Sequence, residues 1–270
     1  MRCAVDQFQK IILLFLLAVP SAHAELILSS APRESREKEE SIYKPVADLL
    51  SRASGQKVSF RYADNFLVYQ DKMRKGAYDI VLDGPTFVAW RMARLGHVPV
   101  VKFPGNLSFV VVVQASNEKI KTLKDLTGRT LCGFAPPNLA TMTILYEFGN
   151  PSRQPLIIEA QSFKEAYQGL AQGKCAGAIM QGKIFADLDK ETRLGKVIFQ
   201  SNPLPNQAIS AGPRVTPEMR AKMVTALLAP ENAPATQKMR EFFRSTALLP
   251  ASAEEYRGLE KLMRDVWGFD

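Results

Sequence analysis

The sequence is poor in the residues that build most catalytic and metal sites. Its 270 residues include two histidines and three cysteines. The motifs HExxH, GxSxG and GxGxxG, a Walker phosphate loop and paired CxxC motifs do not occur. A Ser-His-Asp site would have to converge on His97, the single histidine beyond residue 24. We therefore expect no catalytic residues, no metal site and no cofactor.

The apolar run near the amino terminus, Ile11–Val19, is too short to span a bilayer. It follows basic residues and precedes small residues at positions 22–24, a pattern typical of a secretory signal peptide over residues 1–24. The alternative is a short buried helix. We expect a mature periplasmic protein that begins at Glu25. Because Cys3 precedes the apolar run, we expect no lipid anchor.

The positive charge of the chain is scattered. Thirty-five Lys and Arg against 27 Asp and Glu give a net charge of +8. The sequence lacks the long basic block, or the basic stripe interleaved with aromatic residues, that nucleic-acid-binding surfaces carry. We therefore expect a monomer with a solvated basic surface and no nucleic-acid partner.

Strand and helix patterns alternate along the chain, which favours an α/β fold with parallel sheets flanked by helices. Expected strands cover Leu26–Ser30, Val58–Tyr62, Tyr78–Leu82, Val98–Phe103, Leu107–Val113, Arg129–Phe134, Leu156–Glu159, Cys175–Met180, Val197–Gln200 and Ala208–Ala211. Expected helices start after Ser35 and Thr216 and cover Phe66–Arg74, Phe87–Leu95, Ser162–Gln172, Ala235–Ser245 and Ser252–Trp267.

The pattern starts again near Lys119, which predicts two lobes. We expect residues 25–112 and 205–270 to form lobe 1 and residues 113–204 to form lobe 2. The chain would then cross between the lobes near Val113–Ala115 and Pro205–Gln207.

Polar or aromatic residues follow the carboxyl ends of several expected strands, where ligands of open α/β sheets bind. Each such loop taken singly could be no more than a capped helix start. Together they predict a ligand cleft. The candidate ligand-binding residues are Ser30, Arg33, Asn65, Phe66, Asp83, Thr86, Asn138, Leu139, Ala140 and Thr141, with Gln181 and Gln207 as second-tier candidates.

Two cysteines remain after removal of the expected signal peptide, Cys132 and Cys175. An even count in an exported protein favours a disulfide. The alternative is a pair of buried free thiols.

Several segments resemble the phosphate/phosphite/phosphonate-binding branch of type II periplasmic solute-binding proteins of ABC transporters. They are YADNFLVYQDKMRKGAYDI (62–80), KTLKDLTGRTLCGFAPPNLATMT (121–143), SFKEAYQGLAQGKCAGAI (162–179) and NPLPN (202–206). The resemblance implies two α/β lobes joined by a two-strand hinge, a small-molecule ligand and an inner-membrane ABC permease as partner. Two alternatives on the same fold are a sensory protein that docks on a histidine-kinase ectodomain and a small-molecule lyase.

The sequence departs from that family at its ligand site. Where the family opens a helix with Ser-Thr-Ser, this chain has Leu139, Ala140 and Thr141. Family phenol positions fall near Phe66 and Asp83. Because a carboxylate would repel an anion, we expect that tight phosphonate binding has been lost and that Asp83 favours an amine or a zwitterion.

Overall fold

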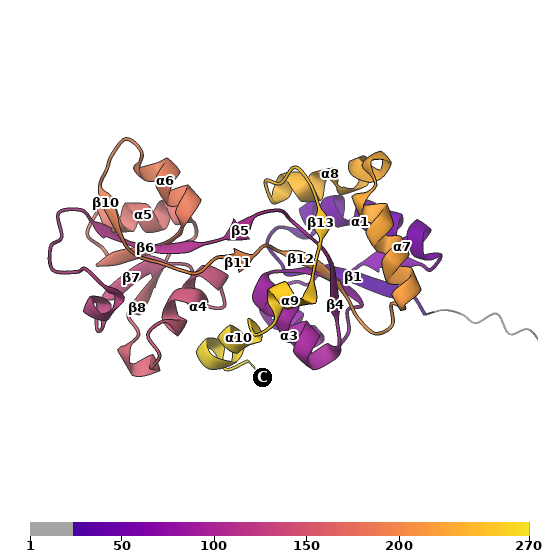
Figure 1. The fold of residues 1–270 in the computed structure, drawn as a ribbon, viewed down its shortest axis with the longest axis horizontal. Helices are drawn as coiled ribbons and strands as arrows, with labels where there is room; N and C mark the ends of the chain where they lie inside the picture. Colours follow the sequence, from indigo (N-terminus) through magenta and orange to yellow (C-terminus); the bar gives the residue numbers. More distant parts are fainter. Residues whose placement is uncertain (1–23, 270) are drawn as a thin grey trace, which may run out of the picture.

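The computed structural model describes residues 24–269, which form two lobes joined by two extended segments (Figure 1). The expected α/β fold with a two-strand hinge is confirmed. The predicted signal peptide lies outside the described residues, except for Ala24.

Lobe 1 holds the amino- and carboxyl-terminal parts of the described chain. Its elements are β1 (Leu26–Ser30), α1 (Arg36–Ser54), β2 (Val58–Phe60), α2 (Phe66–Arg74), β3 (Ile80–Asp83), α3 (Pro85–Leu95), β4 (Val98–Lys102), β12 (Ala208–Ala211), α7 (Pro217–Leu228), η3 (Pro230–Asn232), α8 (Ala233–Phe242), β13 (Leu249–Pro250), α9 (Ala253–Tyr256) and α10 (Glu260–Trp267). Its sheet has the order β13-β4-β12-β3-β1-β2, and β1 is parallel to both β2 and β3. The carboxyl ends of these three strands therefore lie at one edge of the sheet.

Lobe 2 is smaller and is built on a second sheet with the order β10-β6-β9-β7-β8. Its elements are β6 (Phe109–Gln114), η1 (Leu123–Leu126), β7 (Thr130–Gly133), α4 (Leu139–Tyr146), η2 (Pro151–Arg153), β8 (Leu156–Glu159), α5 (Phe163–Ala171), β9 (Gly177–Gln181), α6 (Gly182–Asp189) and β10 (Gly195–Gln200). Helix α6 escaped the sequence analysis because it opens on Gly182, a poor helix former. Its partly buried Ile184, Phe185 and Leu188 pack on the lobe 2 core.

Local sequence accounts for where the helices begin and end. The Ser35 hydroxyl accepts a hydrogen bond from the Lys38 amide at the start of α1, and Gly55 ends α1 in the left-handed conformation with φ 72°. The side chain of Asn65 caps α2 in the same way. These caps fix the loops that follow β1 and β2, and hence the edge of the sheet that faces lobe 2.

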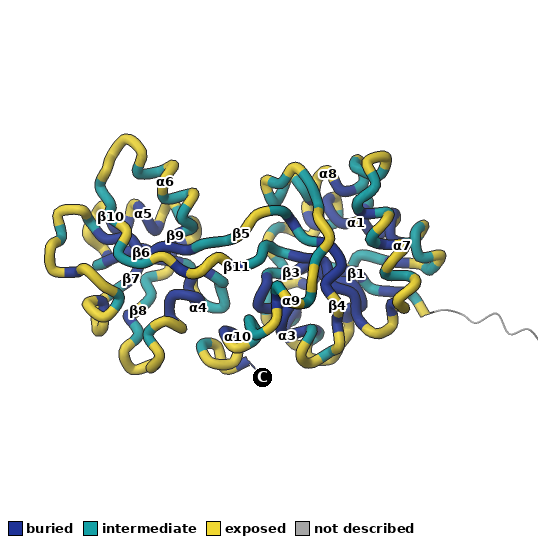
Figure 2. Tube along the Cα trace, viewed as in Figure 1, coloured by how far each residue is buried: buried dark blue, intermediate teal, exposed yellow. Residues whose placement is uncertain are grey.

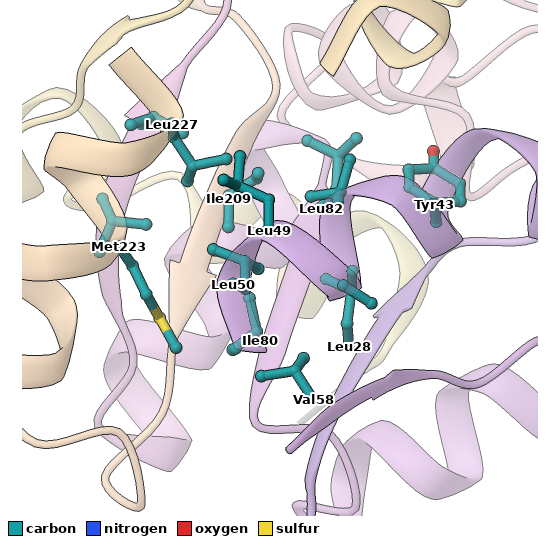
Figure 3. Close-up of a cluster of buried hydrophobic side chains, with 14 of the residues drawn as sticks. Leu28, Tyr43, Leu49, Leu50, Val58, Ile80, Leu82, Ile209, Met223 and Leu227 are labelled. Atoms are coloured by element: carbon teal, nitrogen blue, oxygen red, sulfur yellow. The ribbon is translucent and has the colours of Figure 1, made fainter. Parts of the chain in front are cut away.

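Two hydrophobic cores cover the faces of the lobe 1 sheet, and buried residues concentrate along its strands (Figure 2). On one face, α1 and α7 pack on the strands through residues that include Leu50, Ile80, Ile209 and Met223 (Figure 3). On the other face, α2, α3 and α10 enclose a cluster rich in aromatic side chains. Lobe 1 thus has a rigid base beneath its ligand-facing edge.

The chain crosses between the lobes at two short strands, β5 (Asn106–Leu107) and β11 (Leu204–Pro205), which pair antiparallel. The Asn206 side chain also donates a hydrogen bond of 3.0 Å to the Pro104 carbonyl. The second crossover lies next to the expected position. The first does not lie near Val113–Ala115, because β6 pairs with β9 and β10 in the lobe 2 sheet.

The predicted disulfide between Cys132 and Cys175 is present, with a Cα–Cα distance of 5.7 Å. It joins β7 to the turn before β9. Helix α5 packs directly over the bridge at Gly169, where a Cβ atom would lie 2.7 Å from the Cys132 Sγ. A side chain at this position would collide with the disulfide.

We expect Gly169→Ala to lower the free energy of unfolding by about 1–3 kcal/mol, because the added methyl overpacks the bridge. In a Cys132→Ala/Cys175→Ala background the same change should be neutral or stabilising by up to ~1 kcal/mol, since alanine favours helix once Sγ is gone. Urea denaturation of the four proteins measures both effects. An equal loss in both backgrounds would contradict the proposed collision.

Candidate functional site: a cleft between the lobes

A cavity of about 470 Å³ lies between the two lobes. Its walls are the loops at the carboxyl ends of β1, β3, β7 and β8, the first turn of α2, and the second crossover. The lining residues are Ala31, Arg33, Phe66, Gly84, Thr86, Phe87, Phe134, Ala135, Pro136, Pro137, Asn138, Leu139, Glu159 and Gln207. The volume is that of a site for a small molecule.

The lobe 1 wall is partly aromatic. Phe66 opens α2 and Phe87 lies in the first turn of α3, and their ring centroids are 5.7 Å apart. Pro85 sits at the first position of α3, so Gly84 and Thr86 line the cavity where that helix begins. Arg33 reaches the cavity from the loop after β1 and is solvent-exposed.

The lobe 2 wall is the loop from β7 to α4. The Asn138 side chain accepts a 2.9 Å hydrogen bond from the Ala140 amide, which occupies a donor at the helix start. The Thr141 hydroxyl, buried, donates to the Phe134 carbonyl at 2.6 Å. Two donors that could have held an anion therefore bind the protein itself, so this wall is poorer in free donors than its helix start suggests.

Asp83 does not line the cavity. Its side chain is fully buried and accepts hydrogen bonds from Arg91 Nε at 2.6 Å and from the Tyr69 hydroxyl. Arg91, equally buried, also donates to the Tyr69 hydroxyl at 3.0 Å. Burial and the Asp83 charge raise the pKa of Tyr69 well above its usual value. The expectation that Asp83 meets the ligand is wrong, because its buried carboxylate pairs with Arg91 and does not line the cavity.

Six of the sequence-predicted residues line the cavity: Arg33, Phe66, Thr86, Asn138, Leu139 and Gln207. The other six do not line it. Ser30 donates to Glu39 at 3.1 Å, Asn65 caps α2, and Gln181 lies at the start of α6. Ala140 is buried in the lobe 2 core behind Leu139.

The most consequential lining residue that the sequence analysis missed is Glu159. It is the last residue of β8 and is exposed to solvent. The rule that ligands bind at the carboxyl ends of parallel strands could have found it. Among the described residues, the charged side chains that line the cavity are Arg33 in lobe 1 and Glu159 in lobe 2. The cavity thus presents opposite charges from its two sides.

Within residues 24–269, no cluster of three or more His, Cys, Asp or Glu side chains is arranged to hold a metal ion. Over the same residues, no helix combines the length and the apolar character that crossing a membrane requires.

The family of periplasmic substrate-binding proteins of phosphonate ABC transporters matches residues 28–256. The chain belongs to this family, whose members bind a substrate for an ABC transporter. This confirms the solute-binding role expected from the sequence and lends no support to the sensory or lyase alternatives. A search of curated proteins finds no significant match.

Solved structures share the fold. XAC2383 from Xanthomonas citri bound to ATP has a TM-score of 0.71 at 15% identity, with 91% of this chain and 98% of that chain covered. PhnD1 from Prochlorococcus marinus in complex with methylphosphonate has a TM-score of 0.64 at 11% identity, covering 90% and 98%. The binding component PA3383 of a phosphonate transporter from Pseudomonas aeruginosa has a TM-score of 0.58 at 13% identity, covering 88% and 85%.

We expect Asp83→Asn to destabilise lobe 1 strongly, by about 3–5 kcal/mol, because it leaves the buried Arg91 charge without its partner. Thermal or urea denaturation measures this change. The matched control is Asp64→Asn, which removes an ion pair to Arg36 whose side chains are 65% and 58% exposed. Exposed pairs contribute about 0–1 kcal/mol. Equal effects of the two substitutions would refute the assigned role of Asp83.

A pH dependence follows from His97, which is buried and lies with its Nδ1 3.1 Å from the Ser210 hydroxyl. Burial, aided by the positive charge of Arg91, lowers the pKa of His97 to about 3. The unfolded chain takes up this proton near pH 6.5, so the stability that neutral His97 gives at pH 7 is lost as the pH falls below about 6.5 toward 3.

The expected loss from this residue is about 2 kcal/mol between pH 7 and pH 5. Glu39 and Asp79, whose pKa values burial raises, change stability in the opposite direction, so the His97 contribution is read by difference. We expect His97→Gln to flatten the wild-type decline and Ser210→Ala, which keeps the ring, to preserve it. Denaturant titrations at several pH values decide the matter.

Proposed function

We propose that the cleft binds a small zwitterion, with its anionic group toward Arg33 and its cationic group toward Glu159. The observation that carries this proposal is the placement of the two charged lining residues on opposite lobes. A ligand that carries both charges can engage both lobes at once. Its binding would therefore favour closure of the lobes about β5 and β11.

The apolar part of the cavity fits the middle of such a ligand. Phe66 and Phe87 form one wall, and Phe134 stands on the other, held edge-to-face against Phe163 at 5.0 Å. Aromatic faces also attract an organic cation, so they would assist Glu159 in holding an amine. Asn138 and Gln207 add uncharged polar groups at the edges.

We further propose that this cleft has lost tight binding of simple phosphonates. Asp83 does not contribute to this loss, because Arg91 neutralises its charge and it does not line the cavity. The loss follows from the helix start in lobe 2. It rests on Leu139 and Ala140 at the helix start and on the Thr141 hydroxyl, which donates to the Phe134 carbonyl. Each hydrogen bond to a charged group contributes about 1.5–3 kcal/mol, so the loss of two donors should lower the affinity for an anion by at least a hundredfold.

In the cell, we infer that the protein carries its ligand as a monomer through the periplasm to an inner-membrane ABC permease and releases it chemically unchanged. The family match supports this role. A binding protein returns its ligand intact, so incubation with a metabolite mixture followed by mass spectrometry would detect any turnover.

The charge arrangement is tested by calorimetry with amino acids, aminoalkyl sulfonates, aminoalkyl phosphonates and simple alkyl phosphonates. We expect binding among the zwitterions and none of submicromolar affinity among phosphonates that lack an amine. Glu159→Gln and Arg33→Gln should each lower the affinity for the zwitterion by roughly tenfold or more, since each removes a charge-assisted contact.

The matched controls are Glu147→Gln in lobe 2 and Arg52→Gln in lobe 1, two exposed residues that do not line the cavity. They should leave affinity unchanged. Submicromolar binding of methylphosphonate, or indifference of the bound zwitterion to Glu159→Gln, would overturn the proposal.

A further inference from the structure

The carboxyl-terminal segment, residues 252–269, contacts both lobes. Helix α10 packs on α3 of lobe 1 and on α4 of lobe 2, and it lies between these two helices in Figure 1. The chain therefore has a physical link between its lobes in addition to the two crossovers.

The segment is anchored firmly on lobe 1. Phe269 is buried, its ring centroid lies 5.2 Å from that of Trp90, and the Arg74 guanidinium stacks over it at 4.1 Å. Gly268 ends α10 in the left-handed conformation with φ 64°, which turns Phe269 back so that its amide donates to the Met263 carbonyl at 3.1 Å. Phe269 is thus anchored on lobe 1.

Helix α10 also meets lobe 2, through the same hydrophobic cluster. Leu262 and Met263 share one hydrophobic cluster with Met142 of α4 and with Phe87 and Trp90 of α3. Met142 and Met263 are fully buried. The neighbouring residue Leu139 packs on the same cluster, on the lobe 2 core and on the ligand cavity.

The same segment also contacts residues that lie next to both crossovers. The Tyr256 hydroxyl, on a fully buried side chain, donates to the Asn206 carbonyl at 2.8 Å. Glu255 pairs with Lys102 at the end of β4, just before the first crossover. Hinge rotation that moves α4 relative to α3 must therefore disturb contacts of this one segment.

We propose that the carboxyl-terminal segment is a third interlobe connection, which holds lobe 2 against lobe 1 through the packing of Met142 against α10 and so restricts the hinge. The connection acts from outside the ligand cavity. It is independent of the proposed ligand, because it concerns the two lobes alone.

The test measures the distance between the lobes in the ligand-free protein. Spin labels are attached at Asp48→Cys on α1 and Asp187→Cys on α6, both exposed positions, with the native disulfide intact. Pulsed electron paramagnetic resonance then measures the distance between the two labels. We expect Met142→Ala and Met263→Ala each to broaden the interlobe distance distribution, and the double variant to broaden it no further than the larger single effect.

Each variant has a matched control. Met223→Ala in α7 and Met180→Ala in β9 remove equally buried methionines from the cores of lobe 1 and lobe 2, away from the interlobe cluster. These controls should lower stability without changing the distance distribution. Because an alanine variant could fail to fold, Met142→Gln and Met263→Gln give a second, near-isosteric disruption, and Met→Leu at either position should restore the narrow wild-type distribution. An unchanged distribution in folded Met142 and Met263 variants, or an equal broadening in the controls, would overturn the proposal.

Discussion

The buried carboxylate of Asp83 fixes the position of the lobe 1 side of the cavity. A charge removed from water needs a partner, and Arg91 supplies it from α3 while Tyr69 supplies a hydroxyl from α2. The network ties the end of β3 to the two helices whose first turns carry Phe66 and Phe87. Since Gly84 follows Asp83 directly and lines the cavity, the position of the wall depends on an ion pair that does not line the cavity itself.

In lobe 2, a disulfide and two hydrogen bonds hold the strand and loop that form the cavity wall. The disulfide fixes β7 beneath α5, and the loop that follows β7 is closed by the Thr141 bond to the Phe134 carbonyl and by the Asn138 cap. These bonds consume polar groups of the loop. The loop is therefore left with fewer free donors for an anion and with a largely apolar surface. Glu159 is the charged side chain of lobe 2, within the described residues, that lines the cavity.

The sequence predicted the architecture well because the signals are local. Strands β1, β8 and β12 and helix α2 have the predicted bounds, since Ser30, Asn65 and Glu159 mark clear breaks in the apolar pattern. The first crossover lies earlier than predicted. Leu107 of β5 and Phe109–Val113 of β6 form an apolar stretch broken only by Ser108, and the change of lobe shows only in the pairing partners. Pairing between distant strands leaves little trace in a single sequence.

Six of the twelve predicted site residues line the cavity, and the other six do not. Rules on strand ends located Arg33, Thr86 and Asn138, because these depend on chain direction alone. They could not tell whether a polar side chain points to the cavity or into the core, which depends on partners far along the chain, as Arg91 shows for Asp83. Among the described residues, the charged side chains that line the cavity are Arg33 and Glu159, each on a different lobe. Binding of the proposed zwitterion by both would depend on the distance between the lobes. In the proposed arrangement, contacts at the hinge and at α10 set that distance, so affinity for the proposed ligand depends in part on residues outside the cavity.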